Sequence, residues 1–563
     1  MVLRARPLAP PALALLLAVL VALAAAGPAP ARADVTLTRP DSPTAPPRGY
    51  ERDARAVVRL ADATEEVRAE REVHARLRGT ALTEGPGGRW RVSYRAPGGG
   101  EERVRVVVDD ASGRVLEAWR GAQVAWPMAR GYDGAFGRSV SAPWIWLPLC
   151  VLFLAPFVDP RRPLRLLHLD LLVLLLFGAS HAFFNRGEIE WSVPLAYPVL
   201  LYVLGRMLWV GLRPRAGRGP LVPLAPPGLL LLGIVFLVGF RVALNVADSN
   251  VIDVGYAGVI GADRVTGPGE LYDGSFPEDN PHGDTYGPVN YLLYVPWELL
   301  FPLRGGAAGS LPGAHAAALA FDLGTLALLV LLGRRLRPGE EGRRLGLALG
   351  YAWASYPYAL YVLASNANDS LVALGVVAAL LALESPARRG AALALVAAAK
   401  FAPLLLVPLW ATGRGPARGR AWLPFALAFV VAWALVWVPF LPAGGIEQVW
   451  ERTLWSQLDR ESPFSVWGRW PELRAVQIAV EAATVAGALA LAWRPRERTP
   501  GQVAALGAAL LVALQIATTH WFYLYVVWWA PLTFVALFAL HSTDPAREER
   551  EAAPAQAREP VAA

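Results

Sequence analysis

Residues 221–244 read LVPLAPPGLLLLGIVFLVGFRVAL, and Arg241 is the charged residue of this apolar run. A helix rises about 1.5 Å per residue, so about 20 apolar residues cross the ~30 Å hydrocarbon core of a bilayer. Similar runs recur from Trp144 onward, separated by short charged loops. They predict an all-α polytopic membrane protein with about 11 spans. The expected spans lie near 143–158, 166–184, 192–211, 221–244, 311–333, 344–364, 369–384, 421–441, 473–493, 501–518 and 521–541.

The composition agrees with a membrane protein. Hydrophobic residues make up 55% of the 563 residues and charged residues 18%, against about 45–50% and about 25% in soluble domains. The 21 tryptophans and 16 tyrosines suit membrane interfaces. The net charge of +7 is first a topology signal, because Lys and Arg accumulate in cytoplasmic loops. The sequence has no basic face interleaved with aromatic residues, so nothing in it indicates nucleic-acid binding. Cys150 is the single cysteine, which excludes an intramolecular disulfide.

The N-terminus has the pattern of a signal peptide over residues 1–33. Arg4 and Arg6 precede an apolar stretch at 11–26, and Ala31–Ala33 offers a small-x-small cleavage site. The alternative is an uncleaved anchor, and either form exports the segment that follows. Residues 34–49 are rich in Pro, Thr and Ser and are expected to be a linker.

Residues 50–126 are expected to form a small α+β domain outside the cell. The pattern predicts a helix over Tyr50–Leu77, strands at 90–94, 104–108 and 115–119, and a turn at Asp109–Gly113. The stretch from Val106 to Val115, VVVDDASGRV, resembles the PepSY domain. That resemblance implies a regulatory or interaction module, and His74 is expected to be solvated on the helix.

The charge rule orients the spans. The basic loops are expected to be cytoplasmic, which places the long loops 245–290 and 442–472 outside. Loops 385–390 and 412–420 are both basic, so a single span between them would expose one of them outside. A re-entrant pair of half-helices turning near Lys400 and Pro403 satisfies both, and such irregular backbone survives in a membrane only where it lines a cavity. Residues 289–302 are expected to form an outer-surface helix.

The first outer loop contains the richest set of polar residues. Carboxylates directly after an apolar helix are costly unless they are solvated or used, although an ordinary polar loop explains the composition too. The side chains of interest there are Asp248, Asp253, Tyr256, Tyr272, Asp279, His282, Asp284, Tyr286 and Tyr291.

Four further groups of polar residues, here called polar islands, follow in the sequence. Each of them also has a simpler structural explanation that involves no function. Asn368 and Asp369 stand between two spans, where a simple turn is the alternative. Lys400 lies in an apolar run and needs an anionic partner, unless it extends to an interface. Arg460 suits a phosphate but also a surface ion pair with Asp459 or Glu461. Ser465 lies in the same loop, and His520 is in an aromatic segment typical of a membrane edge.

The order of these motifs resembles the first outer loop of GT-C glycosyltransferases, above all glycosyltransferase family 87. The elements are an apolar helix, Asp-x-x-Tyr-Ala at 253–257, Gly-x-x-Tyr at 269–272 and Tyr-x-Pro at 286–288. The resemblance covers residues 221–541. It implies an inverting transferase with a polyprenyl-phosphate sugar donor, mannose being the leading choice. Asp253 would be the base, with Asp248 in reserve.

The resemblance also implies roles for the other islands. Lys400 and Arg460 would neutralise the leaving lipid phosphate. The acceptor would be an extracytoplasmic glycan, glycolipid or protein. The bias of the composition toward Ala, Arg, Gly, Pro and Leu is typical of a high-GC bacterium, so the expected location is a bacterial plasma membrane. The expected substrate-binding residues are Tyr256, Tyr272, Asp284, Tyr286, Asn368, Asp369, Lys400, Arg460, Ser465 and His520. Residues 143–220 are an extension of unassigned role, and 542–563 are expected to be a disordered cytoplasmic tail.

No metal or nucleotide motif occurs in the sequence, so no cofactor is expected. A divalent cation held by Asp279, His282 and Asp284 is the minor alternative. Two other functions stay open at this point. A transporter or flippase would show two similar halves with broken helices, and a non-catalytic sensor would use the PepSY-like domain as its receptor.

Overall fold

The computed structural model describes residues 37–85, 88–95, 102–131, 137–217, 219–277, 280–303, 311–415, 421–458 and 462–543. The expected signal peptide and most of the C-terminal tail lie outside these ranges, as do Asp279 and Arg460. The chain divides into two compact units, residues 30–135 with 182–192, and residues 136–181 with 193–563.

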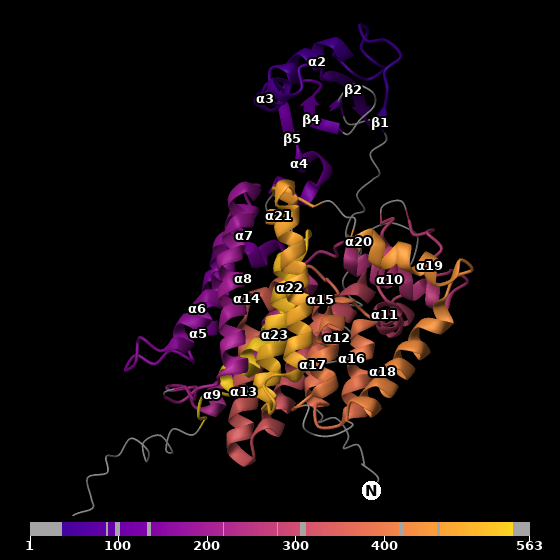
Figure 1. Ribbon diagram of the computed structural model, residues 1–563. Coiled ribbons are helices and arrows are strands. Elements are labelled where there is room, and N and C mark those ends of the chain that lie inside the picture. Colours follow the sequence, from indigo (N-terminus) through magenta and orange to yellow (C-terminus); the bar gives the residue numbers. More distant parts are fainter. Residues whose placement is uncertain are drawn as a thin grey trace, which may run out of the picture. The chain divides into compact units, whose positions relative to one another are not determined.

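The N-terminal unit is a five-stranded antiparallel sheet with helices packed against it (Figure 1). The strands pair in sequence order, and the alternating residues Trp90, Val92 and Tyr94 pack in one core with the helices. The elements are β1 Leu37–Thr38, α2 Ala54–Asp62, α3 Glu65–Val73, β2 Arg78–Glu84, β3 Arg89–Arg95, β4 Glu102–Asp109, β5 Val115–Arg120, α4 Ala122–Ala125 and the 3-10 turn η1 Pro127–Arg130.

The three predicted strands are present, whereas β1 and β2 were not predicted. The expected helix over Tyr50–Leu77 is wrong as a single element: α2 ends at Asp62, and Thr64 is extended, with its hydroxyl donating to the Ala61 carbonyl at 2.8 Å. The break lets two short helices place Val57 and Val67 on the same core, which a straight helix would not do.

A buried aspartate fixes the turn after β4. Asp110 is 3% exposed and accepts hydrogen bonds from the backbone N–H groups of Glu51 and Arg52 and, at 2.8 Å, from the Trp90 indole. Asp109 caps the neighbouring turn through Ser112 N at 2.8 Å. One acidic residue therefore ties the N-terminal segment to the core tryptophan, and the other only shapes the turn.

Asp110→Ala is expected to destabilise this unit by about 1–3 kcal/mol, because the Trp90 indole N–H would stay buried without an acceptor. Hydrogen exchange of the β3 and β4 amides in the full-length protein measures the effect. Asp109→Asn, which keeps the turn acceptor, is the matched control and should change exchange by no more than about 0.5 kcal/mol. Equal exchange in the Asp110 variant and the wild type would contradict this role.

The second unit is a bundle of helices (Figure 1). Its elements before the first candidate site segment are η2 Arg138–Ser141, α5 Pro143–Leu154, α6 Leu166–Leu175, α7 Phe177–Phe184, α8 Ile189–Leu212 and α9 Pro227–Ala247. The middle part has α10 Asp253–Thr266, η3 Gly283–Thr285, α11 Pro288–Leu300, α12 Pro312–Leu336, α13 Gly339–Ser355, α14 Pro357–Ala364, α15 Asp369–Leu381, α16 Pro386–Ala397, η4 Ala402–Leu406 and α17 Val407–Thr412. The last part has α18 Trp422–Trp437, η5 Val438–Phe440, α19 Gly445–Trp450, the π-helical turn η6 Glu451–Trp455, α20 Ser456–Leu458, α21 Val466–Arg469, η7 Pro471–Leu473, α22 Arg474–Trp493, α23 Pro500–Ala517, η8 Tyr523–Tyr525 and α24 Val526–Phe538.

Seven helices of the described residues are long and apolar enough to cross a membrane. They are Leu166–Phe184, Ile189–Leu212, Pro227–Ala247, Pro312–Leu336, Trp422–Phe440, Pro471–Trp493 and Pro500–Ala517, and four shorter apolar helices accompany them. Large apolar side chains on α9 and α18 point outward, among them Phe236 at 63% and Leu427 at 65% exposure. Contiguous apolar surface of this kind is costly in water and favourable against lipid, so the chain is a membrane protein.

Two expected spans have different boundaries. The span predicted over 344–364 is divided into α13 and α14, because Pro357 lacks an N–H and begins a new helix after Tyr356. The last helix begins at Val526 rather than at residue 521, after the 3-10 turn η8. α11 is present at Pro288–Leu300, close to the expected surface helix.

A buried ion pair joins α9 to α12. The Arg241 guanidinium contacts the Asp322 carboxylate at 2.5 Å, and the Trp353 indole donates to the same carboxylate at 3.0 Å. Both charged side chains are at most 1% exposed. The single charge of the opening apolar run is therefore neutralised inside the bundle.

Candidate functional site

Hydrogen bonds join the segment after α9 to the segment before α15. Asn245 donates to the Leu363 carbonyl at 2.9 Å and to the Asn366 side chain at 2.8 Å. The backbone N–H of Asn250 binds the Ala364 carbonyl at 3.0 Å, and that of Ile252 binds the Ser365 carbonyl at 3.2 Å. These bonds bring the first residue of α10, Asp253, close to the start of α15.

Asn366 and Gly255 make this close approach possible. Asn366 adopts a left-handed backbone with φ of +48°, a conformation that asparagine tolerates better than most residues. A Cβ on Gly255 would come 2.2 Å from the Asn366 carbonyl oxygen, so only glycine fits in the first turn of α10. The side chain of Asp253 is exposed at this point, and Asn280 donates to its backbone carbonyl at 2.8 Å.

The phenol of Tyr286 is influenced by two carboxylates. Burial raises the pKa of the Tyr286 phenol, and the negative charges of Asp253 and Asp369 raise it further. The backbone around it is held by neighbouring tyrosines: Tyr272 donates to the Tyr286 carbonyl at 2.9 Å, and the Tyr286 N–H binds the Tyr291 hydroxyl at 3.2 Å. Both acidic groups are therefore near enough to Tyr286 to act on its phenol.

A second backbone contact brings Lys400 to the same place. The Gly287 N–H binds the Ala399 carbonyl at 3.2 Å, and the Val289 N–H binds the Ala398 carbonyl at 3.1 Å. A Cβ on Gly287 would come 2.1 Å from the Ala398 carbonyl oxygen. The start of α11 is therefore fixed to Ala398 and Ala399, the two residues between the end of α16 and Lys400.

Gly287→Ala is expected to lower the free energy of unfolding by about 1–3 kcal/mol, because the methyl group would push α11 away from a rigid backbone carbonyl. Thermal unfolding of the purified protein in one detergent measures it. Gly239→Ala is the matched control, since Gly239 lies in α9 with nothing within 4 Å of its Cβ position. A melting temperature for the Gly287 variant equal to that of the control would contradict the contact.

Lys400 stands at the turn of a helical hairpin. α16 ends at Ala397, and the chain continues through η4 into α17. Arg389, near the start of α16, donates to the carbonyls of Trp410 and Ala411 at the end of α17, at 2.7 and 3.0 Å. The two outer ends are therefore side by side, and the chain reverses between them near Lys400, as the two basic loops indicate.

The Lys400 ammonium group is paired with Asp369 at the N-terminus of α15. The Nζ–Oδ1 distance is 2.6 Å, and the two side chains are 11% and 1% exposed. The same carboxylate oxygen accepts from the Trp528 indole at 2.8 Å. Nζ also lies 5.4, 5.9 and 5.3 Å from the ring centroids of Tyr286, Tyr525 and Trp528, and cation–π attraction adds to the ion pair there. Lys400 is thus held in an aromatic cage with its side chain mostly buried.

Unpaired polar atoms surround this ion pair. Asn368 donates to Asn290 Oδ1 at 2.8 Å. Within the described part of the chain, five buried atoms of α11 and α15 have no hydrogen-bond partner: Asn290 Nδ2, Tyr294 Oη, Asn368 Oδ1, Asp369 Oδ2 and Ser370 Oγ. A native protein leaves few such groups unpaired, so donors and acceptors are gathered here beyond what the fold itself uses.

Two predicted acidic residues have structural partners instead. The Asp248 carboxylate accepts from Ser139 and faces Arg138. Asp284 is 2% exposed and paired with Arg452 at 2.6 Å. Burial raises the pKa of Asp284, and Arg452 partly offsets that rise.

Ser465 also has a structural partner: it is fully buried, and its hydroxyl caps α21 by accepting from the Gly468 N–H at 3.1 Å. His520 is half-buried and contacts the Ser462 hydroxyl at 2.8 Å, with its ring 6.1 Å from that of Tyr525. His520 therefore reaches the Lys400 cage through Tyr525. Tyr256 is buried in α10, in the same apolar cluster as Tyr272 and Tyr291.

Sequence reasoning missed Trp528, Tyr525, Asn290 and Tyr294. The two aromatic residues lie in an apolar run that reads only as a span, so their sequence carries no signal of an ion pair. Asn290 and Tyr294 are four residues apart on α11, and this helical spacing within a polar-flanked segment was the available clue. The described residues contain no group of three His, Cys, Asp or Glu that could hold a metal ion.

Part of the chain matches a protein-family model. Residues 285–519 match the family model of glycosyltransferase family 87, which is less than half of the chain. The matched segment includes Tyr286, Asp369 and Lys400, begins after Asp253 and ends just before His520. No curated protein matches the chain. Over this segment the membrane protein is similar to glycosyltransferase family 87, and the match indicates a glycosyltransferase.

Proposed function

We propose that this protein is a GT-C type glycosyltransferase that moves a monosaccharide from a polyprenyl-phosphate donor to an acceptor outside the cell. The observation that carries the proposal is that an exposed carboxylate and a caged ammonium group both act on Tyr286: the charge of Asp253 raises the pKa of its phenol, and Lys400 Nζ lies 5.4 Å from its ring centroid. The carboxylate suits the hydroxyl of an acceptor, and the ammonium group suits a phosphate. The match to glycosyltransferase family 87 supports the same reaction class.

The reaction needs a base for the acceptor. Asp253 would take the proton of the acceptor hydroxyl while its oxygen attacks the anomeric carbon and the carbon–oxygen bond to the phosphate breaks. Attack from the face opposite the phosphate inverts the anomeric centre. Asp253 suits this role better than Asp369, which is buried and bound to Lys400, or Asp248, which is bound by Ser139.

Lys400 would neutralise charge on the leaving polyprenyl phosphate. Its ammonium group has three N–H donors, and one of them points at Asp369. The other two suit phosphate oxygens, and stabilising negative charge as it develops commonly contributes most of the rate enhancement in such reactions. Arg460 remains our proposed second cation for the phosphate. In this scheme Asp369 positions Lys400 and does not itself touch the reacting atoms.

The sugar would be held by the polar groups around the pair. Asn368, together with Asn290 and Tyr294, offers buried donors and acceptors that the fold does not use, and a monosaccharide is recognised through such groups. Tyr286 and His520 would line the path of the sugar into the site. Tyr256 and Tyr272 belong to the apolar cluster against which Tyr286 packs, and they would hold it in position. We propose mannose as the sugar that is transferred. The acceptor would be a glycan, a glycolipid or a protein.

The proposal extends to location. We propose that this site faces the outer side of a bacterial plasma membrane, as the charge rule favours, and that the N-terminal PepSY-like domain is a regulatory or interaction module. A sensor or transporter gives no reason for Asp253 and Lys400 to converge on one tyrosine, so neither alternative gains support.

A donor panel tests the function. Purified protein in proteoliposomes is given polyprenyl-phosphate mannose, the same lipid carrying glucose or arabinose, and a nucleotide-linked sugar, with a bacterial envelope fraction as acceptor. We expect label to leave a lipid-linked donor and not the nucleotide donor, and the product linkage to be inverted in its NMR coupling constants. Transfer from the nucleotide sugar alone, or retention of configuration, would overturn the proposal.

A further inference from the structure

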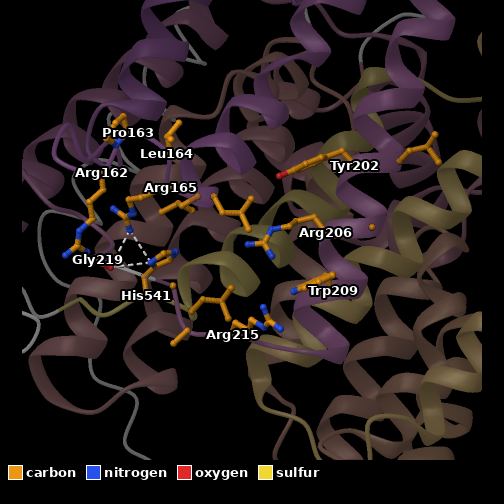
Figure 2. Close-up of a pocket in the computed structure, with 17 residues that line it drawn as sticks. Arg162, Pro163, Leu164, Arg165, Tyr202, Arg206, Trp209, Arg215, Gly219 and His541 are labelled. Atoms are coloured by element: carbon orange, nitrogen blue, oxygen red, sulfur yellow. Dashed lines mark hydrogen bonds between the residues drawn. The ribbon is translucent and has the colours of Figure 1, made fainter. Parts of the chain in front are cut away.

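A basic cavity lies outside the matched family segment, lined by residues that precede it and by residues that follow it. Its volume is about 1340 Å³. It is bounded by the residues that begin α6, by the second half of α8, by the loop after α8 and by the segment after α24. Figure 2 shows Arg162 and Arg165 on one side and Arg206 and Trp209 across from them.

Four arginines line this cavity: Arg162, Arg165, Arg206 and Arg215. The described lining residues include no Asp or Glu. Arg206 is paired at 2.8 Å with Asp170, a residue 2% exposed that lies behind the lining. The cavity therefore has an excess of positive charge, and the N-terminus of α6 adds its partial positive charge to it.

His541 completes the wall without adding charge. Arg165 donates to His541 Nδ1 at 3.1 Å, and both contact the Gly219 carbonyl (Figure 2). Burial, and next the positive charge of Arg165, lower the pKa of His541 to about 4. The ring is therefore neutral at neutral pH and serves as a fixed partner that orients Arg165.

The rim of the cavity is apolar and exposed. Leu164 is 99% exposed, Leu166 51%, Leu201 56% and Trp209 51%. The Arg215 guanidinium lies 5.7 Å from the Trp209 ring centroid. A cationic cavity with an apolar rim fits a molecule that carries an anionic head and a hydrocarbon tail, and it does not fit a fully hydrated anion equally well.

The cavity is remote from the Lys400 site. Trp528, in the first turn of α24, contacts Asp369, and the chain reaches the cavity at His541 after the helix ends. α23 starts near Gly211, where Gln502 donates to the Gly211 carbonyl at 2.9 Å, and ends just before His520. The two sites therefore lie at opposite ends of the same helices, about 20–27 Å apart along them at a rise of about 1.5 Å per residue.

We propose that this cavity binds the phosphate headgroup of an anionic phospholipid, with Arg162 and Arg215 on the phosphate and the acyl chains along Leu164, Leu166 and Leu201. Arg165, beside His541, and Arg206, beside Asp170, complete the positive surface. The site is independent of the proposed transferase reaction. By the charge rule it belongs to the cytoplasmic leaflet, which is rich in anionic lipids.

The competing explanation is that these arginines only orient the protein, like any basic loop. A charge-matched pair of variants separates the two. Arg162→Gln with Arg215→Gln removes two cavity cations. Arg213→Gln with Arg388→Gln removes two exposed cations outside the lining.

Native mass spectrometry of the full-length protein in neutral detergent counts the lipids that stay bound. With phosphatidylglycerol we expect one retained lipid, bound about tenfold more weakly by the cavity variant and within about twofold of wild type by the control, since two charge-assisted hydrogen-bonded contacts are lost. Phosphatidylcholine should be retained poorly by all three proteins. Equal retention of phosphatidylglycerol by both variants would overturn the proposal.

A cavity-filling variant tests the same site without a change of charge. Gly205 lines the cavity and has nothing within 4 Å of its Cβ position, so Gly205→Leu should fold and occlude it. Gly239→Leu, equally unobstructed in α9, is its control. We expect only Gly205→Leu to lose the lipid. Displacement of the lipid by inorganic phosphate at low millimolar concentration would assign the site to free phosphate and contradict the lipid proposal, as would displacement only by polyprenyl phosphate.

Discussion

Asp253→Asn is expected to lower the rate of sugar transfer by about 10²–10⁴-fold, the usual contribution of a general base. The amide has the same shape as the carboxylate but cannot take the acceptor proton. Because the Asp253 side chain is exposed, the variant should fold as the wild type does. Initial rates of label transfer from the lipid-linked donor, at saturating donor, measure the effect.

Two further variants make this result specific. Asp263→Asn alters an exposed carboxylate on the same helix, α10, and should keep the wild-type rate. Asp248→Asn tests the other candidate for the general base. This variant should keep most of the transfer activity, because Asp248 is already bound by Ser139. A rate loss in Asp248→Asn together with a normal rate in Asp253→Asn would reverse the assignment.

Lys400→Met is expected to destabilise the protein by about 3–5 kcal/mol and to abolish transfer. The substitution leaves the Asp369 carboxylate buried without its counter-ion, and breaking a buried pair in this way costs more than the pair contributes. Thermal unfolding in a single detergent measures stability. The transfer assay measures activity, where losing one positioned charge costs about 10²–10³-fold.

The double variant Lys400→Met with Asp369→Asn separates the two effects. It removes both charges, so much of the stability should return, whereas transfer should stay absent because the phosphate partner is still missing. Arg389→Met is not an equivalent control, since that side chain fixes the hairpin. Recovery of transfer in the double variant would show that Lys400 serves stability alone.

The turn at Lys400 was predictable because the positive charge of the two flanking loops conflicts with the length of the segment between them. Two basic loops flank a stretch too short for two spans, and reversal of the chain resolves the conflict. The structure has that reversal, with Arg389 binding the far end of the hairpin. The membrane character of the chain was predictable for a similar reason, since it depends on long runs of one residue class.

The partners of the polar residues were not predictable in the same way. Asp284 and Ser465 look like Asp253 in the sequence, yet one binds Arg452 and the other caps a short helix. A polar side chain in a loop has many possible partners, and only the folded chain decides among them. Trp528 was missed because an indole within an apolar run does not reveal that its N–H meets a buried carboxylate.

Some changes of local conformation were also hidden in the sequence. β2 was missed because its inward positions are the small residues Ala81 and Thr83, which give a weak alternating pattern. The break between α13 and α14 was missed because hydrophobicity continues through it, although Pro357 marks the point. A strong apolar signal hides a change in backbone direction.

The most direct test of the proposed function is the transfer of radiolabelled mannose from its polyprenyl-phosphate carrier by the purified protein in proteoliposomes, with wild type and Asp253→Asn measured side by side. We expect donor-dependent transfer by the wild type and about 10²–10⁴-fold less by the variant. Equal transfer by the two proteins would contradict the assigned base. No transfer from any lipid-linked sugar in the panel, by a protein that is folded and inserted, would contradict the glycosyltransferase itself.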